Sequence, residues 1–110
     1  MGATTETVVW VKKEVLPLFS QGKDLEVRLG SPLTEWVEAG DIIVFNETLR
    51  RRVAAIRRYI GVDRMLEGEG FNPSRIYPGR TIPDIKAALI EIYGSRALNR
   101  EMVVWELVEP

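Results

Sequence analysis

The charged side chains whose types and spacing best suit chemistry lie close together, at Lys23, Glu26 and Arg28. They fall in a stretch that alternates apolar and polar residues, which predicts a half-buried strand. Glu26 and Arg28 are two residues apart, so on a strand both side chains leave the same face and can form an ion pair. A lysine beside a carboxylate can also act in acid–base catalysis, if burial lowers the pKa of the lysine. The plainer interpretation is an ion pair on a solvated sheet face, which contributes about 0–1 kcal/mol to stability.

The residue types that are missing exclude several kinds of enzyme. The chain of 110 residues has no cysteine and no histidine. A cysteine nucleophile, a Ser-His-Asp triad and a zinc site of the usual nitrogen and sulfur ligands are therefore excluded. The sequence also has no Walker loop, dinucleotide fingerprint or calcium loop. We expect no metal and no cofactor, and any catalysis must use lysine, carboxylates, hydroxyl groups or tyrosine.

Arginine is concentrated in the middle of the chain, where it could contact nucleic acid. Residues 48–80 hold eight arginines and three acidic side chains, whereas residues 1–47 hold four basic and eight acidic ones. A strand here could carry a phosphate-binding stripe made of Arg50, Arg51, Arg52, Arg57 and Arg58. Simple alternation would place Arg50, Arg52 and Arg58 on one face and the other two on the opposite face. Acidic side chains of neighbouring strands could also pair with them, so ordinary charged surface remains the alternative.

A loop rich in glycine and proline follows, and it combines aromatic and basic residues. It runs from Phe71 and Asn72 to Arg80. An aromatic ring that stacks on a base, with arginine on the phosphate, suits single-stranded RNA. Arg75 and Arg80 are the binding candidates in this loop, whereas Tyr77 could equally anchor it to the core.

The three tryptophans differ in their sequence context. Trp10 and Trp105 stand in apolar segments rich in β-formers, which predicts that both belong to the core. Trp36 falls in a short helical piece of a connection, where its ring could serve as a stacking platform for a base.

The elements that must position these residues can be predicted from the pattern of apolar residues. Strands are expected at 7–11, 23–29, 42–45, 49–60 and 102–108. Helices are expected near 12–20, 62–69 and 83–93, with a short helical piece at 34–37. Short strands with small helices between them favour an α+β fold, built as a small mixed β-barrel of five or six strands with about three short helices.

Length and composition indicate a single domain over residues 1–110. With 45% hydrophobic and 28% charged residues, the chain is typical of a soluble globular protein. The sequence shows neither a long apolar segment nor a recognisable leader, so we expect a cytoplasmic protein without a membrane partner. The abundance of arginine and glutamate with a single glutamine also resembles the composition of thermophile proteins.

The order of short motifs along the chain resembles the ASCH family of the PUA-like superfamily. Lys23 to Arg28 follows the K-x-x-E-x-R core of that family, and Gly40 to Phe45 is similar to its G-D-x-I-x-F strand. Further similar pieces are Arg57-Arg58-Tyr59, Met65-Leu66, Ile90 to Gly94 and Val104 to Leu107. The resemblance covers residues 7–108. One departure is that Gly22 and Lys23 are adjacent, where the family usually has a residue between them.

The resemblance implies a PUA-like barrel with a cleft beside the K-x-x-E-x-R strand, and RNA is the ligand usually proposed for it. In that hypothesis Lys23 and Arg28 bind phosphate or a base acceptor, and Glu26 orients them or accepts from a base amino group. A basic rim would be extended by Arg57, Arg75 and Arg80, with Trp36 nearby. We therefore expect an RNA-binding or modified-nucleotide-binding domain.

Some members of the family resemble enzymes, which leaves two alternatives. One branch resembles an amidohydrolase of N4-acetylcytidine that uses a lysine, a threonine three residues later and a distant glutamate, and another relative is described as a ribonuclease. Here Glu26 stands where that threonine would be, so the hydroxyl nucleophile is missing at its expected place. The enzymatic alternative is a small hydrolase with Lys23 as base or activator and Glu26 as its partner. The last alternative is a regulatory module that binds a protein.

Overall fold

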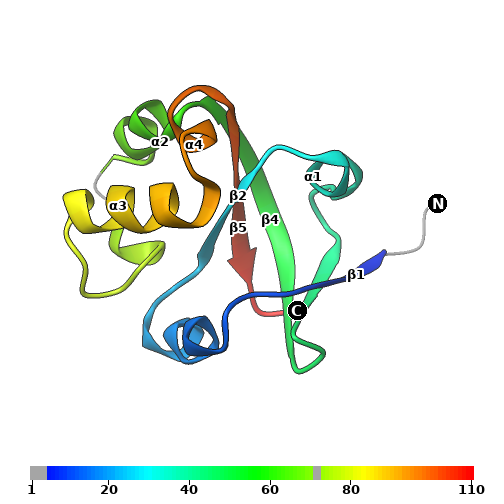
Figure 1. Cartoon of the computed structure of the whole chain (residues 1–110). Coiled ribbons are helices and arrows are strands. Elements are labelled where there is room, and N and C mark those ends of the chain that lie inside the picture. Colours follow the sequence, from blue (N-terminus) through cyan, green and yellow to red (C-terminus); the bar gives the residue numbers. More distant parts are fainter. Residues whose placement is uncertain (1–4, 71–72) are drawn as a thin grey trace.

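Five strands form one mixed, open sheet (Figure 1). The structure is a computed structural model that describes residues 5–70 and 73–110. Its strands are β1 (Glu6–Val9), β2 (Leu25–Leu29), β3 (Ile42–Phe45), β4 (Leu49–Ile60) and β5 (Glu101–Val108). Their order is β1-β3-β4-β5-β2, in which β1 and β3 are parallel and every other neighbouring pair is antiparallel. The expected α+β class is confirmed. Among the described strands, however, the edges β1 and β2 do not pair, so the sheet does not close into a barrel.

The helices are short, and most lie where the sequence predicts them. They are η1 (Lys13–Gln21), α1 (Pro32–Trp36), α2 (Val62–Glu69), η2 (Pro73–Arg75), α3 (Ile82–Tyr93) and α4 (Arg96–Asn99). The first of them is a 3₁₀-helix that contains Pro17, a residue that cannot donate an α-helical hydrogen bond. The sequence did not predict η2 and α4. None of the helices in the described part of the chain is long and apolar enough to cross a bilayer.

Both faces of the sheet are covered, because alternate strand residues enter two separate apolar cores. The first core lies under α2, α3 and α4, and its members include Leu25, Val27, Met65, Ile85, Leu89, Met102 and Val104. The second core lies on the opposite face and includes Val9, Phe19, Ile43, Phe45, Val53 and Trp105. Figure 1 shows α2, α3 and α4 gathered on one side of the sheet, with α1 on the other. Glu26 and Arg28 alternate with Leu25 and Val27, so their side chains lie on the face of the second core. Glu26 is buried there, and the interpretation of this ion pair as one on a solvated face is therefore wrong for Glu26.

A β-bulge in β4 changes the alternation of its arginines. The register with β5 shifts between Val53 and Ala55. A bulge inserts one extra residue, so side chains after it face the opposite side from the one that simple counting gives. Arg51 pairs across the sheet with Ile43, and Arg58 pairs with Val103; both of these neighbours belong to the second core. Arg58 therefore shares its face with Arg51, and the expected grouping of Arg58 with Arg50 and Arg52 is wrong.

The junction between β4 and α2 depends on a glycine. Gly61 has a φ of 84°, a backbone conformation that side chains with a Cβ rarely adopt. A Cβ at this position would lie 2.5 Å from the backbone carbonyl oxygen of Leu98, which cannot move away as a side chain could. We expect Gly61→Ala to lower the free energy of unfolding by about 3 kcal/mol, through backbone strain and overpacking together. Urea denaturation measures this loss.

Gly40→Ala is the matched control for that substitution. Gly40 also has a positive φ, 96°, but a Cβ there meets no atom within 4 Å. It therefore carries the backbone strain alone, and we expect a loss of about 1 kcal/mol. Equal losses for the two substitutions would contradict the close approach of Gly61 to Leu98.

Candidate functional site

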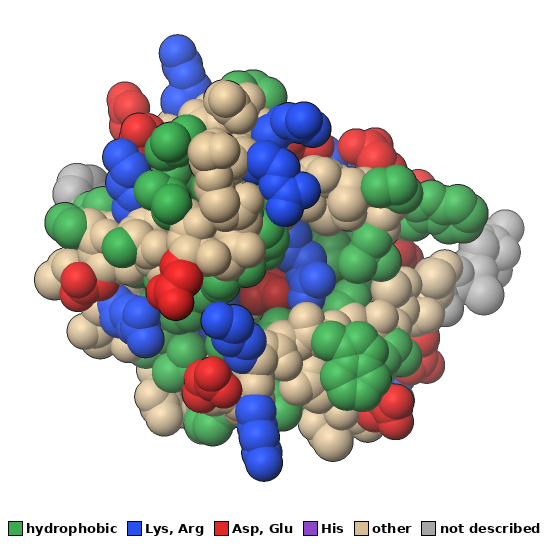
Figure 2. All heavy atoms as spheres, in the orientation of Figure 1, with side chains coloured by type: hydrophobic (Ala, Val, Ile, Leu, Met, Phe, Trp, Pro, Cys, Tyr) green, Lys and Arg blue, Asp and Glu red, His purple; other side chains and the backbone are tan. Residues whose placement is uncertain are grey.

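A cleft opens between the edge strand β2 and the segment that follows the other edge strand, β1, beside α3. Its walls come from the segment after β1 (Trp10, Val11, Lys12, Val15), from β2 (Glu26, Val27, Arg28), from Tyr77, and from α3 (Leu89, Ile92, Tyr93). The cavity has a volume of about 250 Å³. Figure 2 shows this face of the molecule hollowed near its centre, with acidic and basic side chains inside the hollow. The cleft thus lies at the β2 edge of the open sheet.

The carboxylate of Glu26 lies between two cations. Its Oε1 is 3.3 Å from Nζ of Lys23, and its Oε2 is 3.1 Å from Nη2 of Arg28 and accepts a hydrogen bond of 3.2 Å from Nε. Only 8% of the Glu26 side chain is exposed. A carboxylate oxygen has two acceptor positions, so one that is held by a cation can still accept from a ligand. Glu26 therefore provides a fixed anionic acceptor in the wall of the cleft.

Lys23 supports Glu26 from a buried position. The side chain of Lys23 is 2% exposed, and its ammonium donates to the backbone oxygens of Leu25 (2.7 Å) and Ile76 (3.0 Å) in addition to the contact with Glu26. Burial is the largest influence on the pKa of Lys23 and lowers it, while the negative charge of Glu26 acts in the opposite direction. Three acceptors occupy the three ammonium N–H groups. Lys23 is not among the described residues that line the cleft, so it positions Glu26 without facing a ligand.

Arg28 and Asn46 hold the segment that forms the far wall of the cleft. Nη2 of Arg28 donates to the backbone oxygen of Trp10 at 2.9 Å, which links β2 to the chain just after β1. The side-chain amide of Asn46 accepts from the backbone N–H of Val11 at 2.8 Å and donates to its carbonyl at 3.0 Å. Asn46 lies in the β3–β4 turn with a φ of 52°, which asparagine tolerates better than most residues. No pattern in the sequence singles out Asn46 as a positioning residue.

Aromatic side chains form much of the cleft wall. The prediction that Trp105 is a core residue is confirmed, whereas that for Trp10 is wrong: Trp10 is 62% exposed and lines the cleft, because β1 ends at Val9. Burial, with the nearby charge of Glu26, raises the pKa of Tyr77 and raises that of Tyr93 to about 12. The Tyr93 hydroxyl donates to the backbone oxygen of Val27 at 3.2 Å. Both phenols therefore stay neutral at pH 7 and offer flat apolar surface.

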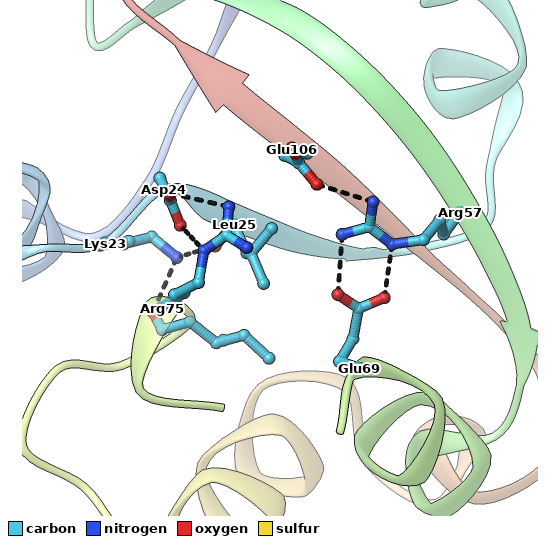
Figure 3. A network of polar contacts seen from close by, with 8 residues as sticks. Lys23, Asp24, Leu25, Arg57, Glu69, Arg75 and Glu106 are labelled. Atoms are coloured by element: carbon cyan, nitrogen blue, oxygen red, sulfur yellow. Dashed lines mark hydrogen bonds and ion pairs between the residues drawn. The ribbon is translucent and has the colours of Figure 1, made fainter. Parts of the chain in front are cut away.

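The structure places Arg57 on the face of the sheet opposite to Glu26 and Arg28, and Arg57 is not among the described residues that line the cleft. Its guanidinium donates to both carboxylate oxygens of Glu69 (2.7 and 2.8 Å) and to Glu106 (2.8 Å), as Figure 3 shows. Tyr59 donates to the same Glu69 carboxylate at 2.6 Å. These contacts attach α2 to β4 and β5, and they engage three of the five N–H groups of Arg57 within the protein.

Arg75, Arg80 and Trp36 lie at three different places. Arg75 forms a two-pronged ion pair with Asp24 (2.5 and 2.8 Å), visible in Figure 3, which fixes the loop to the start of β2. The guanidinium of Arg80 lies over the ring of Tyr77, 5.3 Å from its centre, at the edge of the cleft. Trp36 is 81% exposed on α1 and does not contribute to the cleft wall. Phe71 and Asn72 lie outside the described residues.

The other arginines of β4 also have partners within the protein. Arg50 pairs with Glu6, Arg51 with Glu109, and Arg58 with both Glu35 and Glu101. Arg52 donates to the backbone oxygen of Gly40 at 2.9 Å. This pairing, together with the distribution over two faces, favours ordinary charged surface over a continuous phosphate-binding stripe.

The fold and the cleft define a small α+β domain that has a pocket with aromatic walls and an ion pair at the edge of its sheet. The described residues hold no cluster of three or more Asp or Glu side chains that could bind a metal ion.

No family model and no curated protein matches the sequence. Solved structures that are similar to this chain include the following two. The crystal structure of hypothetical protein PH0355 superimposes with a TM-score of 0.82 and 27% identity, over 96% of this chain and 99% of that chain. The solution NMR structure of protein PF0455 from Pyrococcus furiosus gives 0.73 and 28%, over 96% and 97%.

The contacts of Arg57 predict a structural role that can be separated from binding. Glu69 has only 2% of its side chain exposed, so Arg57→Met leaves a buried carboxylate with Tyr59 as its remaining partner. We expect a loss of about 3 kcal/mol in the free energy of unfolding. Arg58→Met is the matched control: it has nearly the same exposure (35% against 33%), but its carboxylate partners are themselves exposed, so the loss should stay below about 1 kcal/mol.

The pH dependence of stability, compared between the native protein and Arg57→Met, tests the same ion pair. Burial raises the pKa of Glu69, but the hydrogen bonds from Arg57 and Tyr59 outweigh burial and hold it below the ordinary value of 4.5. The stability that the ion pair contributes is therefore present above about pH 4.5 and is lost as the pH falls through the lowered pKa. In Arg57→Met, protonation of Glu69 removes the unpaired charge. The deficit of the variant should thus shrink on acidification, and an equal deficit at pH 7 and pH 4 would contradict the assignment.

Proposed function

We propose that this chain binds one unpaired nucleobase in the cleft between β2 and the segment after β1, as part of single-stranded RNA or of a modified nucleotide. The observation that carries the proposal is the fixed Glu26–Arg28 pair in a cleft walled by Trp10, Tyr77 and Tyr93. Recognition of an unstacked base requires flat aromatic surface together with a few polar groups that bind its edge. The cleft offers both.

The polar groups of the cleft match the edge of a base. The Glu26 carboxylate can accept from an exocyclic amino group or a ring N–H, and Arg28 can donate to a ring nitrogen or carbonyl oxygen. Both are held in place before a ligand arrives, so binding does not have to order them. The volume of about 250 Å³ lies below the usual range of about 300–1,000 Å³ for drug-sized ligands. It suits one base better than a longer stretch of nucleic acid inside the cleft.

The resemblance to the ASCH family supports the same assignment. In the K-x-x-E-x-R motif, Glu26 and Arg28 lie on β2, which borders the cleft, and Lys23 lies two residues before this strand begins. RNA binding beside this strand is what the resemblance implies. The hydrolase alternative finds no comparable support, because the ammonium of Lys23 is buried and bound to three acceptors. We therefore propose binding without turnover.

The tryptophans allow the proposal to be tested in one NMR experiment. A titration of the ¹⁵N-labelled protein with a short single-stranded RNA of mixed sequence reports on each backbone amide and each indole N–H. We expect shifts at the indole of Trp10 and at the amides of residues 26–28, 77 and 93. Trp36 is the internal control, since it is more exposed than Trp10 but lies outside the cleft. Equal shifts at Trp10 and Trp36, shifts confined to β4, or no shifts would overturn the proposal.

Two substitutions sharpen the same experiment. Trp10→Ala removes an exposed ring and should leave the fold intact, while affinity should fall about tenfold, since stacking on an aromatic ring contributes about 1–3 kcal/mol per base. Glu26→Gln should weaken binding because the anionic acceptor is lost. Glu67→Gln, an exposed glutamate of α2, makes the same change of charge away from the cleft and should not alter the affinity.

A further inference from the structure

A second, smaller hollow lies beside the cleft, next to Tyr77. This side hollow has a volume of about 140 Å³ and is lined by Lys12, Glu14, Val15, Tyr77, Arg80, Ala88, Glu91 and Ile92. Four of these residues, Lys12, Val15, Tyr77 and Ile92, also line the cleft. The two cavities are therefore neighbours that share a wall, and a ligand bound in the cleft can extend directly into the side hollow.

Two cations stand at the junction of the cavities without an ionic partner. Among the described residues, neither Lys12 nor Arg80 has a carboxylate within 4.0 Å, whereas Arg57, Arg58 and Arg75 are all paired. Lys12 lines both cavities, and Arg80 lies over the ring of Tyr77 that they share. The positive charge next to the cleft is thus available to an anionic ligand.

Two acidic residues also line the side hollow. Glu14 and Glu91, like Arg80, line the side hollow but not the cleft, whereas Lys12 lines both. They disfavour an anion inside the side hollow, so negative charge is best accommodated at the wall shared with the cleft, beside Lys12 and the Tyr77 ring over which Arg80 lies. One phosphate group at the end of a ribose fits this distribution better than a run of phosphates.

We infer that the junction between the cleft and the side hollow binds the phosphate attached to the nucleoside in the cleft, through Lys12 and Arg80. The inference rests on the proposed base-binding function and makes it more specific: the ligand is a phosphorylated nucleotide or a nucleotide within a strand, and a free nucleoside binds less tightly. Partly exposed charge-assisted contacts of this kind should make the phosphate worth about tenfold in affinity.

The test compares each of the four ribonucleosides with its 5′- and 3′-monophosphates, by calorimetry at low salt and at 0.3 M NaCl. For each protein variant, the quantity of interest is the gain in affinity on adding the phosphate. We expect a gain of about tenfold for one of the two phosphate positions, and we expect salt to reduce it. Lys12→Met and Arg80→Met should each cut the gain roughly threefold. Arg64→Met, which removes an exposed positive charge that lines a separate hollow beside α2, should leave it unchanged.

The direction in which Glu91→Gln changes the gain in affinity from the phosphate is a further test. If the phosphate lies at the junction, removal of this neighbouring negative charge should increase the gain. A decrease would mean that the carboxylate, and not the cations, contacts the ligand, which would overturn the inference. Two results would overturn the inference while the base-binding function stands. In the first, nucleosides bind but neither phosphate increases their affinity. In the second, a phosphate increases the affinity equally in the native protein, Lys12→Met and Arg80→Met. Absence of binding for every nucleoside and nucleotide would overturn both.

Discussion

The buried carboxylate of Glu26, with Lys23 on one side and Arg28 on the other, ties together three segments that are far apart in the sequence. Lys23 reaches from Glu26 to the backbone oxygen of Ile76 and thereby holds the loop before α3. Arg28 reaches from Glu26 to the backbone oxygen of Trp10 and holds the chain after β1. Loss of one partner from a buried ion pair typically costs about 3–5 kcal/mol, because the remaining charge is left without compensation. The cleft has its shape because these charges must stay paired.

This constraint also explains why the sheet can remain open. The two edge strands do not pair with each other, yet outward backbone oxygens of β2 have partners. The backbone oxygens of Leu25 and Val27 on β2 accept from Lys23 and from the Tyr93 hydroxyl. Side chains thus occupy hydrogen-bonding positions that a neighbouring strand would otherwise take, which protects the edge from pairing with other chains. The cleft lies beside this edge.

Local patterns in the sequence predict where the strands and helices lie, but not which segments pack over them. The strands at 42–45 and 49–60 and the helix at 62–69 have the predicted bounds, because apolar periodicity and glycine breaks depend on neighbouring residues only. The alternation of β2 was also visible, but no local pattern reveals that η1 and the chain after β1 cover its polar face. The bulge in β4 reversed the expected face of Arg58 for the same reason, since a bulge is a property of strand pairing.

The candidate site was therefore only partly predictable. Glu26 and Arg28 could be singled out from type and spacing, and both line the cleft. Arg57 and Arg75 could not be distinguished from binding residues, because their partners Glu69 and Asp24 are 12 and 51 residues away along the chain. Trp10 was assigned to the core because its segment is apolar, although β1 ends one residue before it. For Arg57, Arg75 and Trp10, contacts between segments that are distant in the sequence determine the role of the side chain.

The pKa of the Lys23 ammonium, followed by NMR in the native protein and in Glu26→Gln, tests the central claim most directly. A buried ammonium whose burial outweighs the charge of Glu26 should titrate below the ordinary value of 10.5. In Glu26→Gln the burial remains and the opposing charge is gone, so the pKa of Lys23 should fall further. An ordinary pKa that does not respond to the substitution would mean that Lys23 is solvated, and that the buried ion triad does not organise the cleft.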